Sequence, residues 1–151
     1  MNDLFELYQA VILDHNRNPR NFRPLPQATH SGTGDNPSCG DNVAVFLQLD
    51  GDRIADVSFQ GSGCAISKAS ASVMTTKLKG QTTAEAGKII REFHHLLTSG
   101  ADPSEEISET TAFAGVHQFP ARIKCATLAW HAAESALRGD ATPVKTEEDS
   151  V

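Results

Sequence analysis

Apolar residues recur with two different periods along the chain, and the changes of period divide it into three parts. Residues 3–15 have the helical period, with Asp3 placed to cap the helix and Glu6 placed for a return contact. The predicted buried face of this helix holds Leu4, Leu7, Tyr8, Val11 and Ile12. Residues 16–26 contain three prolines, which break the pattern and predict an extended connector.

The second part has the period of two that is typical of strands with one buried face. Alternation predicts one strand over residues 43–49 and another over 55–59, and residues 28–34 are a candidate for a short edge strand. The residues expected to face inward are Val43, Val45, Leu47, Leu49, Ala55, Val57 and Phe59. Asp-Gly-Asp at 50–52 is typical of a hairpin, so we expect an antiparallel sheet with one covered face.

The third part returns to the helical period. Residues 65–79 are rich in Ala and Ser, which allows close packing on neighbouring elements. Thr82 and Glu85 form a capping box for a second helix, and Pro120 can begin a last helix that Gly139 ends. On these last two helices the predicted buried residues are Ala86, Ile89, Ile90, Phe93, Leu97, Ile123, Ala126, Trp130, Ala133 and Leu137.

Length and composition indicate a single globular domain. The chain has 151 residues, of which 39% are hydrophobic and 21% charged. We expect the domain to span residues 1–139, with an irregular segment at 101–120, and a disordered acidic tail to span 140–151. The formal net charge of −6 and the lack of a basic run argue against a nucleic-acid partner. With neither a long apolar run nor a secretion signal, we expect no membrane contact and a cytoplasmic location.

The cysteines are the first sign of chemistry. Their number is three, which argues against a disulfide framework and favours a metal or thiol role in a reducing compartment. Cys39 lies in a turn-rich segment, residues 36–41, with Asp41 two positions further on. A packing role is a poor explanation for a cysteine in such a polar loop.

The other two cysteines lie at predicted helix starts. Cys64 follows a Gly-Ser-Gly run, and the dipole at a helix N-terminus favours a thiolate there. Cys125 lies early in the last helix, beside Arg122 and Lys124, whose positive charges would offset a thiolate-rich site.

We therefore expect the fold to bring Cys39, Asp41, Cys64 and Cys125 together around one metal ion. Three thiolates and a carboxylate form a four-coordinate shell that suits tetrahedral Zn²⁺. Soft sulfur ligands also suit iron in a sulfide cluster. A single carboxylate makes the fourth bond more exchangeable, which suits a site that opens or passes something on.

The same residues allow plainer interpretations. A free cysteine is often a small buried hydrophobic residue, and spacing does not exclude this for Cys125. Gly-Ser-Gly at 61–63 resembles part of a dinucleotide fingerprint, but Ile66 replaces its third glycine and the βαβ context is missing. His117, in the loop before the last helix, is the reserve ligand if Asp41 does not bind.

Three motifs in order carry a resemblance to a known family. They are Asn-Pro-Ser-Cys-Gly-Asp at 36–41, Gly-Ser-Gly-Cys-Ala-Ile-Ser at 61–67 and Arg-Ile-Lys-Cys-Ala-Thr-Leu-Ala-Trp at 122–130. Shorter matching segments lie at residues 7–9, 12–15 and 19–21. Over nearly its whole length the chain resembles the iron–sulfur cluster assembly scaffold family of IscU, the NifU N-domain and SufU.

Within this family the chain resembles the SufU branch. IscU-type members carry Leu-Pro-Pro-Val-Lys and a His directly before the third cysteine, whereas this chain has Phe-Pro-Ala-Arg-Ile at 119–123 and Lys124. The segment between Cys64 and Cys125 is also longer, as it is in SufU members. These differences argue against a partnership with the chaperone that binds the IscU segment.

The SufU resemblance implies an α+β fold, a small antiparallel three-stranded sheet with helices packed on one face. It implies a zinc site at Cys39, Asp41, Cys64 and Cys125. It also implies a SufS-type cysteine desulfurase and downstream Suf assembly components as partners. The catalytic residue in this interpretation is Cys39, whose thiolate accepts persulfide sulfur, so the activity is at most that of a zinc-dependent sulfurtransferase. Arg122 pairs with Asp41 or with the partner, or is a plain surface residue.

Two rival functions stay open. In a true scaffold, the same four groups would hold a transient [2Fe–2S] cluster and hand it to apo-proteins. In a plain binding module, zinc would stabilise an interaction domain that performs no chemistry.

Overall fold

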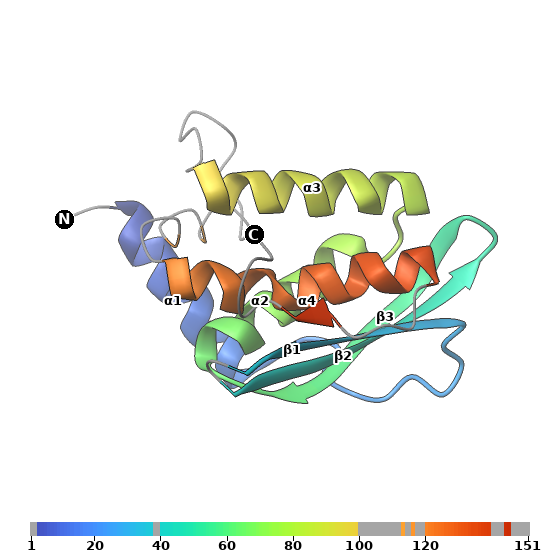
Figure 1. The fold of residues 1–151 in the computed structure, drawn as a ribbon, viewed down its shortest axis with the longest axis horizontal. Coiled ribbons are helices and arrows are strands. Elements are labelled where there is room, and N and C mark those ends of the chain that lie inside the picture. The colour runs from blue at the N-terminus through green and yellow to red at the C-terminus, as the bar shows by residue number, and fades with distance from the viewer. Residues whose placement is uncertain are drawn as a thin grey trace.

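The computed structural model describes residues 3–37, 40–99, 113, 116, 120–139 and 144–145. In chain order its elements are α1 (Asp3–Arg17), β1 (His30–Asn36), β2 (Asp41–Asp50), β3 (Arg53–Ser62), α2 (Ala65–Leu78), α3 (Thr83–Ser99), α4 (Pro120–Arg138) and β4 (Val144–Lys145). The helices gather on one side of the sheet (Figure 1), which confirms the predicted α+β class.

The sheet has the strand order β3-β2-β1-β4. Its first three strands pair antiparallel, as predicted, and β4 joins the other edge of β1 in parallel. Val144 and Lys145 of β4 pair with Gly34 and Asp35, so these two residues of the predicted disordered tail have regular structure. The rest of residues 140–151 lies outside the described residues.

A bulge near the second hairpin changes which residues of β3 face inward. Gln48 pairs with Asp56 and Leu49 pairs with Ile54, which leaves Ala55 without a partner in the ladder. One extra residue reverses the alternation beyond it, so Ile54 is buried and Ala55 is exposed. The prediction that Ala55 faces the core is therefore wrong, because uninterrupted alternation was assumed.

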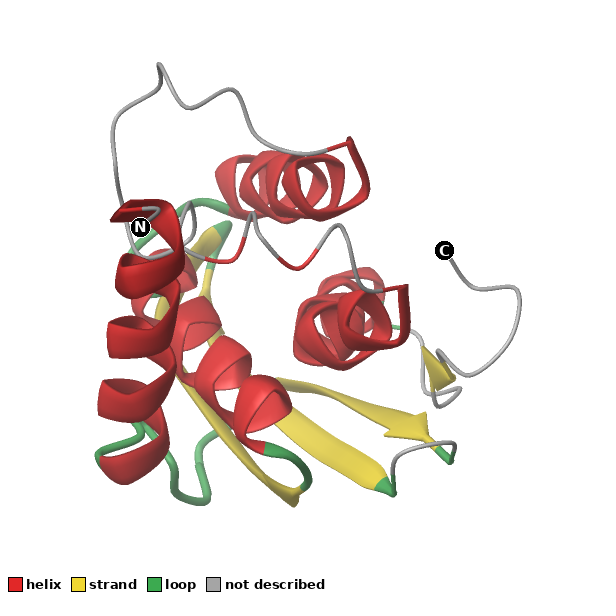
Figure 2. Ribbon diagram, turned by 90° about the vertical axis from the view of Figure 1, so that its left-hand side faces the viewer, coloured by secondary structure: helices red, strands yellow, loops and turns green. Residues whose placement is uncertain are grey.

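The helices form two layers over the sheet. In Figure 2, α2 and α4 lie directly above the strands, α1 runs beside α2, and α3 lies furthest from the sheet. The contact between α4 and β1 is backbone to backbone, because a Cβ added to Gly32 would lie 2.2 Å from the carbonyl oxygen of Ala132. This close packing fixes the start of α4 relative to the end of β1, where the candidate site lies.

The core is built around one large aromatic residue of α4. Trp130 stacks on Phe93 of α3 with ring centroids 3.9 Å apart, and Phe113 meets Phe93 edge to face at 5.9 Å. The indole N–H donates to the Ser70 hydroxyl of α2 at 2.9 Å. One side chain thus ties α3, α4 and α2 together, and the stripes predicted for the last two helices are largely buried.

Two further sequence predictions concern helix ends and the connector. The capping box is confirmed, since the Thr82 N–H donates to Glu85 Oε1 at 3.0 Å and the Glu85 N–H to Thr82 Oγ1 at 3.1 Å. The connector follows the free edge of β3: the Arg23 N–H donates to the Phe59 carbonyl at 3.1 Å, and the Phe59 N–H to the Asn21 carbonyl at 3.0 Å. The segment predicted to be irregular, 101–120, is described only at Phe113, Val116 and Pro120.

Candidate metal centre

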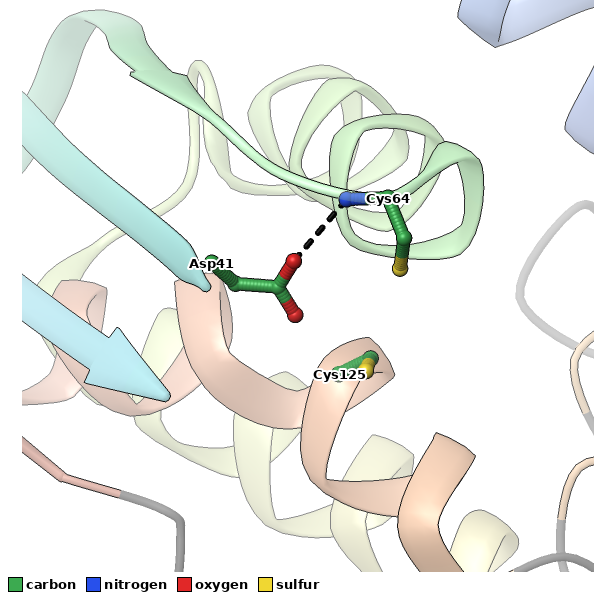
Figure 3. Close-up of side chains that lie close together, drawn as sticks. All are labelled: Asp41, Cys64 and Cys125. Atoms are coloured by element: carbon green, nitrogen blue, oxygen red, sulfur yellow. Dashed lines mark hydrogen bonds between the residues drawn. The ribbon is translucent and has the colours of Figure 1, made fainter. Parts of the chain in front are cut away.

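Three of the four predicted ligands meet at one end of the sheet. Asp41 is the first residue of β2, Cys64 directly precedes α2, and Cys125 lies in the second turn of α4. One ligand atom from each lies within 4.8 Å of the other two. Figure 3 shows the three side chains converging from a strand and two helix starts. Among the described residues, this is the one such group with three or more potential ligands.

Cys64 is the N-cap residue of α2. Its Sγ accepts a hydrogen bond from the Ser67 N–H at 3.4 Å, the position that a Ser or Asp oxygen usually takes at a helix start. A hydrogen bond from Cys125, together with the Ser67 and Ile66 amides, lowers the pKa of Cys64 from 9.0 to about 6, although burial and the Asp41 charge act in the opposite direction. The thiolate of Cys64 is therefore the main form at neutral pH.

Asp41 presents a buried oxygen with nothing to satisfy it. The residue is 0% exposed, and its Oδ1 accepts the Cys64 N–H at 2.8 Å. Its Oδ2 is buried and has no hydrogen-bond partner among the described residues. A buried carboxylate oxygen is costly unless a donor or a cation compensates it. An unsatisfied carboxylate oxygen beside two thiols is a donor set that suits Zn²⁺.

The Gly-Ser-Gly run explains how Asp41 and Cys64 come so close. A Cβ on Gly61 would lie 2.2 Å from the Asn42 carbonyl oxygen, and one on Gly63 would lie 2.5 Å from Asp41 Oδ1. The glycines therefore serve close approach between β3 and β2 and leave room for the carboxylate. Among the described strands, the neighbour of β3 in the sheet is the antiparallel β2, so the described residues lack the adjacent parallel strands that a dinucleotide fingerprint requires.

Cys125 is 4% exposed and has a polar neighbour that the sequence reasoning did not single out. The Asn36 side-chain amide donates to Cys125 Sγ, with 3.7 Å between nitrogen and sulfur. Asn36 is the last residue of β1, and in the β1–β2 ladder it lies directly opposite Asp41. The hairpin register was the available signal, because the residues flanking a short turn face each other.

Cys39 and the reserve ligand His117 lie outside the described residues. Cys39 is nonetheless tied to the site by the chain, since Asn36 and Asp41 are paired and only residues 37–40 connect them.

The remaining described histidines lie apart from the ligand group. His15 is buried, with Nδ1 2.7 Å from the Ser72 hydroxyl. His94 and His131 pack ring against ring with centroids 5.3 Å apart, and burial together with the charge of His94 lowers the pKa of His131. These contacts indicate structural roles for the three histidines.

A cleft of roughly 640 Å³ opens onto the two sulfurs. Cys64 and Cys125 line it together with Ile12 and Leu13 of α1 and Arg122 of α4. Leu13, one of two exposed large apolar side chains among the described residues, is 54% exposed. Arg122 is exposed beside the site.

Comparisons with known proteins place this geometry in context. A family model described as "NifU-like N terminal domain" matches residues 7–126. The zinc-dependent sulfurtransferase SufU of Bacillus subtilis is 41% identical over 136 residues, covering 89% of this chain and 92% of the relative. The iron–sulfur cluster assembly scaffold protein IscU of Streptococcus pyogenes is 35% identical, covering 100% of this chain and 95% of the relative.

Two solved structures have a similar fold. A crystal structure described as a putative iron–sulfur cluster assembly scaffold protein for the SUF system, from Fervidobacterium islandicum, superposes with a TM-score of 0.75 at 33% identity, covering 87% of this chain and 97% of that one. The N-terminal part of a NifU-like protein from Brucella abortus has a TM-score of 0.79 at 24% identity, covering 89% and 94%, and supports the fold alone. None of the described helices has the length and apolar character needed to cross a bilayer.

Proposed function

This chain belongs to the family of NifU-like N-terminal domains, and from that premise we propose that it acts in SUF-type iron–sulfur cluster assembly as a zinc-dependent acceptor of sulfur. The donor in this proposal is a SufS-type cysteine desulfurase, and the product passes to downstream Suf assembly components. The observation that carries the proposal is the Asp41 carboxylate, which has one oxygen within 4.8 Å of two cysteine sulfurs and whose Oδ2 is buried and unsatisfied among the described residues. The identity to the sulfurtransferase SufU of Bacillus subtilis supports it.

The proposed zinc ligands are Cys39, Asp41, Cys64 and Cys125. When bound, zinc supplies a positive charge that keeps its thiol ligands deprotonated and holds them until the donor docks. The protein favours the metal-binding form of Cys64 by itself, because the N-terminus of α2 stabilises the thiolate. Asp41 is a harder ligand than a thiolate, so its bond is the more easily exchanged.

Cys39 is the proposed acceptor. Its thiolate attacks the outer sulfur of the cysteine persulfide on the desulfurase, a new S–S bond forms at Cys39, and the S–S bond of the donor breaks. The cysteine thiolate of the desulfurase leaves with the electron pair, and Cys39 carries the persulfide. Pro37 and Gly40 lie on either side of Ser38 and Cys39, and Gly40 has a φ of 74°, a backbone conformation that favours glycine.

The cleft beside the site suits the approach of the donor. The persulfide of the donor must reach the site through a gap wide enough for a loop, and the cleft of roughly 640 Å³ is lined by Cys64 and Cys125. Its apolar wall from α1 offers surface to bury, and Arg122 offers a positive charge to an anionic sulfur.

The alternative function is a scaffold that assembles and transfers a transient [2Fe–2S] cluster. The identity to the Streptococcus pyogenes scaffold over the whole chain favours it, and the same thiolates suit iron. In that case iron and sulfide are cargo, and the exchangeable Asp41 bond serves release. Persulfide acceptance and cluster assembly differ in what the purified protein contains.

Metal and sulfide analysis of protein purified without air distinguishes these functions. We expect one zinc and no acid-labile sulfide, together with faster desulfurase turnover when the protein is the acceptor. Iron with matching sulfide would favour the scaffold, and zinc without any effect on the desulfurase would leave a binding module. Cys39→Ser should bind metal more weakly and abolish the stimulation, and retained stimulation would exclude Cys39 as the acceptor.

A further inference from the structure

We propose that Asn36 is a positioning residue for the metal-bound sulfur of Cys125, donating an N–H···S hydrogen bond that holds this sulfur and disperses part of its negative charge. The inference rests on the proposed metal site and adds to it a residue that is not a ligand. It starts from the contact of 3.7 Å between Asn36 Nδ2 and Cys125 Sγ.

The place of Asn36 in the fold favours this role. It lies opposite Asp41 at the end of the β1–β2 ladder, so one cross-strand pair supplies both a ligand and the donor to another ligand. The sulfur comes from α4, whose close packing on β1 at Gly32 fixes the distance between helix and strand. The amide on β1 and the sulfur on α4 are therefore carried by two elements that are packed tightly against each other.

The burial of Asn36 also indicates a specific role. The side chain is 1% exposed, and its Oδ1 is buried without a hydrogen-bond partner among the described residues. A buried amide with one unsatisfied atom destabilises a fold, so an alanine or serine would suit a purely structural position better. The orientation is chemically determined, because the alternative flip would turn the amide oxygen, an acceptor, towards an electron-rich sulfur.

The expected consequence follows from the charge on the sulfur. A thiolate ligand that is 4% exposed has almost no water to stabilise it, and an amide N–H is a replacement for that water. Groups that orient and polarise metal ligands typically contribute about 10–100-fold to metal affinity. Without the donor, the Cys125 sulfur is also more electron-rich, which lowers the energy of its charge-transfer transition to a bound Co²⁺.

The test compares Asn36→Ala with Asn42→Ala in the full chain. Asn42 follows Asp41 directly, but its exposed amide donates to the Ser62 hydroxyl at 3.1 Å and not to sulfur, so this variant is a matched control. Zinc affinity is measured by competition with a chelator, and the Co²⁺ derivative is followed by absorption. We expect N36A to lose about 10–100-fold in affinity with a red-shifted sulfur-to-cobalt band, and N42A to match the wild type.

A second variant covers the case in which N36A does not fold. Asn36→Asp keeps the size of the side chain but replaces the N–H donor by an oxygen, so it should show the same loss of affinity and a displaced band. Wild-type affinity and an unshifted band in either folded variant would overturn the role of Asn36. A wild-type chain that binds neither zinc nor cobalt would instead overturn the proposed metal site, and the role of Asn36 with it.

Discussion

Replacing Gly63 by alanine tests whether the geometry around Asp41 holds the metal. The backbone φ of Gly63 is not in the left-handed region, so alanine is allowed there and the added methyl acts through contact alone. That methyl would lie 2.5 Å from Asp41 Oδ1, 3.1 Å from Cγ and 3.2 Å from Cβ. All three atoms belong to the carboxylate-bearing side chain, so Asp41 has to move.

The size of the movement sets the expected effect. Ordinary contact begins at 3.4 Å, so Oδ1 must retreat by about 0.9 Å. Metal sites require ligand distances to within about 0.2 Å, and the retreat also stretches the 2.8 Å hydrogen bond from the Cys64 N–H. We expect Gly63→Ala to weaken zinc binding on the order of 10–100-fold. Overpacking should lower the free energy of unfolding by about 1–3 kcal/mol.

Chelator competition measures the zinc affinity, and urea unfolding of the metal-free protein measures the stability. Gly87→Ala in α3 is the control, because the nearest atom to its added methyl is the flexible end of Arg91 at 3.4 Å. The control should keep its zinc affinity and gain about 0.5–1 kcal/mol of stability, since alanine favours the helix. If the G63A protein bound zinc as tightly as the wild type, the assignment of Asp41 as a zinc ligand would be refuted.

Four further outcomes follow from the structure. Leu13→Asp places a charge on the apolar rim of the cleft, so it should raise the KM of the protein as sulfur acceptor about tenfold while its zinc content stays unchanged; an unchanged KM would place the docking surface elsewhere. In the metal-free protein, alkylation of Cys64 followed by mass spectrometry should reach half its maximal rate near pH 6, and Cys125→Ala should move this midpoint upward by removing the main hydrogen bond; a midpoint near pH 9 would contradict the hydrogen bond. Folding lowers the pKa of His131, so the neutral imidazole stabilises the fold above the unfolded pKa, and this stability is lost as pH falls through the folded pKa. In urea titrations below about pH 6.5, His131→Phe should therefore lose less stability on acidification than the wild type. Asp41→Ala should hold a reconstituted cluster longer if Asp41 makes the site labile, and a shorter lifetime would count against that role.

The sequence predicted the grouping of Asp41, Cys64 and Cys125 better than local patterns alone would allow. Periodicity placed Cys64 and Cys125 at helix starts, but it says nothing about which helix starts meet. The three motifs supplied that information through the family resemblance, and the structure brings Asp41, Cys64 and Cys125 together within 4.8 Å. The membership of Cys39 in the site stays a prediction, supported by its position between two paired residues.

The misses share a physical cause, because each depends on contacts between distant segments. Alternation cannot reveal the bulge at Ala55, which depends on how β3 meets β2. The pairing of Val144 with β1 depends on an edge that exists only in the folded sheet. The role of Gly63, which leaves room for the Asp41 carboxylate, appears only when Asp41 lies beside it.

The way the sheet ends on either side limits how a protein can dock near the metal centre. At one margin β4 occupies the backbone groups of Gly34 and Asp35, and at the other the connector occupies those of Phe59. A partner protein therefore cannot add a strand to the sheet at these positions. Strand addition is a common way in which proteins recognise extended peptides. Recognition near the centre depends instead on side chains and surface shape. A sulfur donor can then dissociate after each turnover without breaking inter-strand hydrogen bonds.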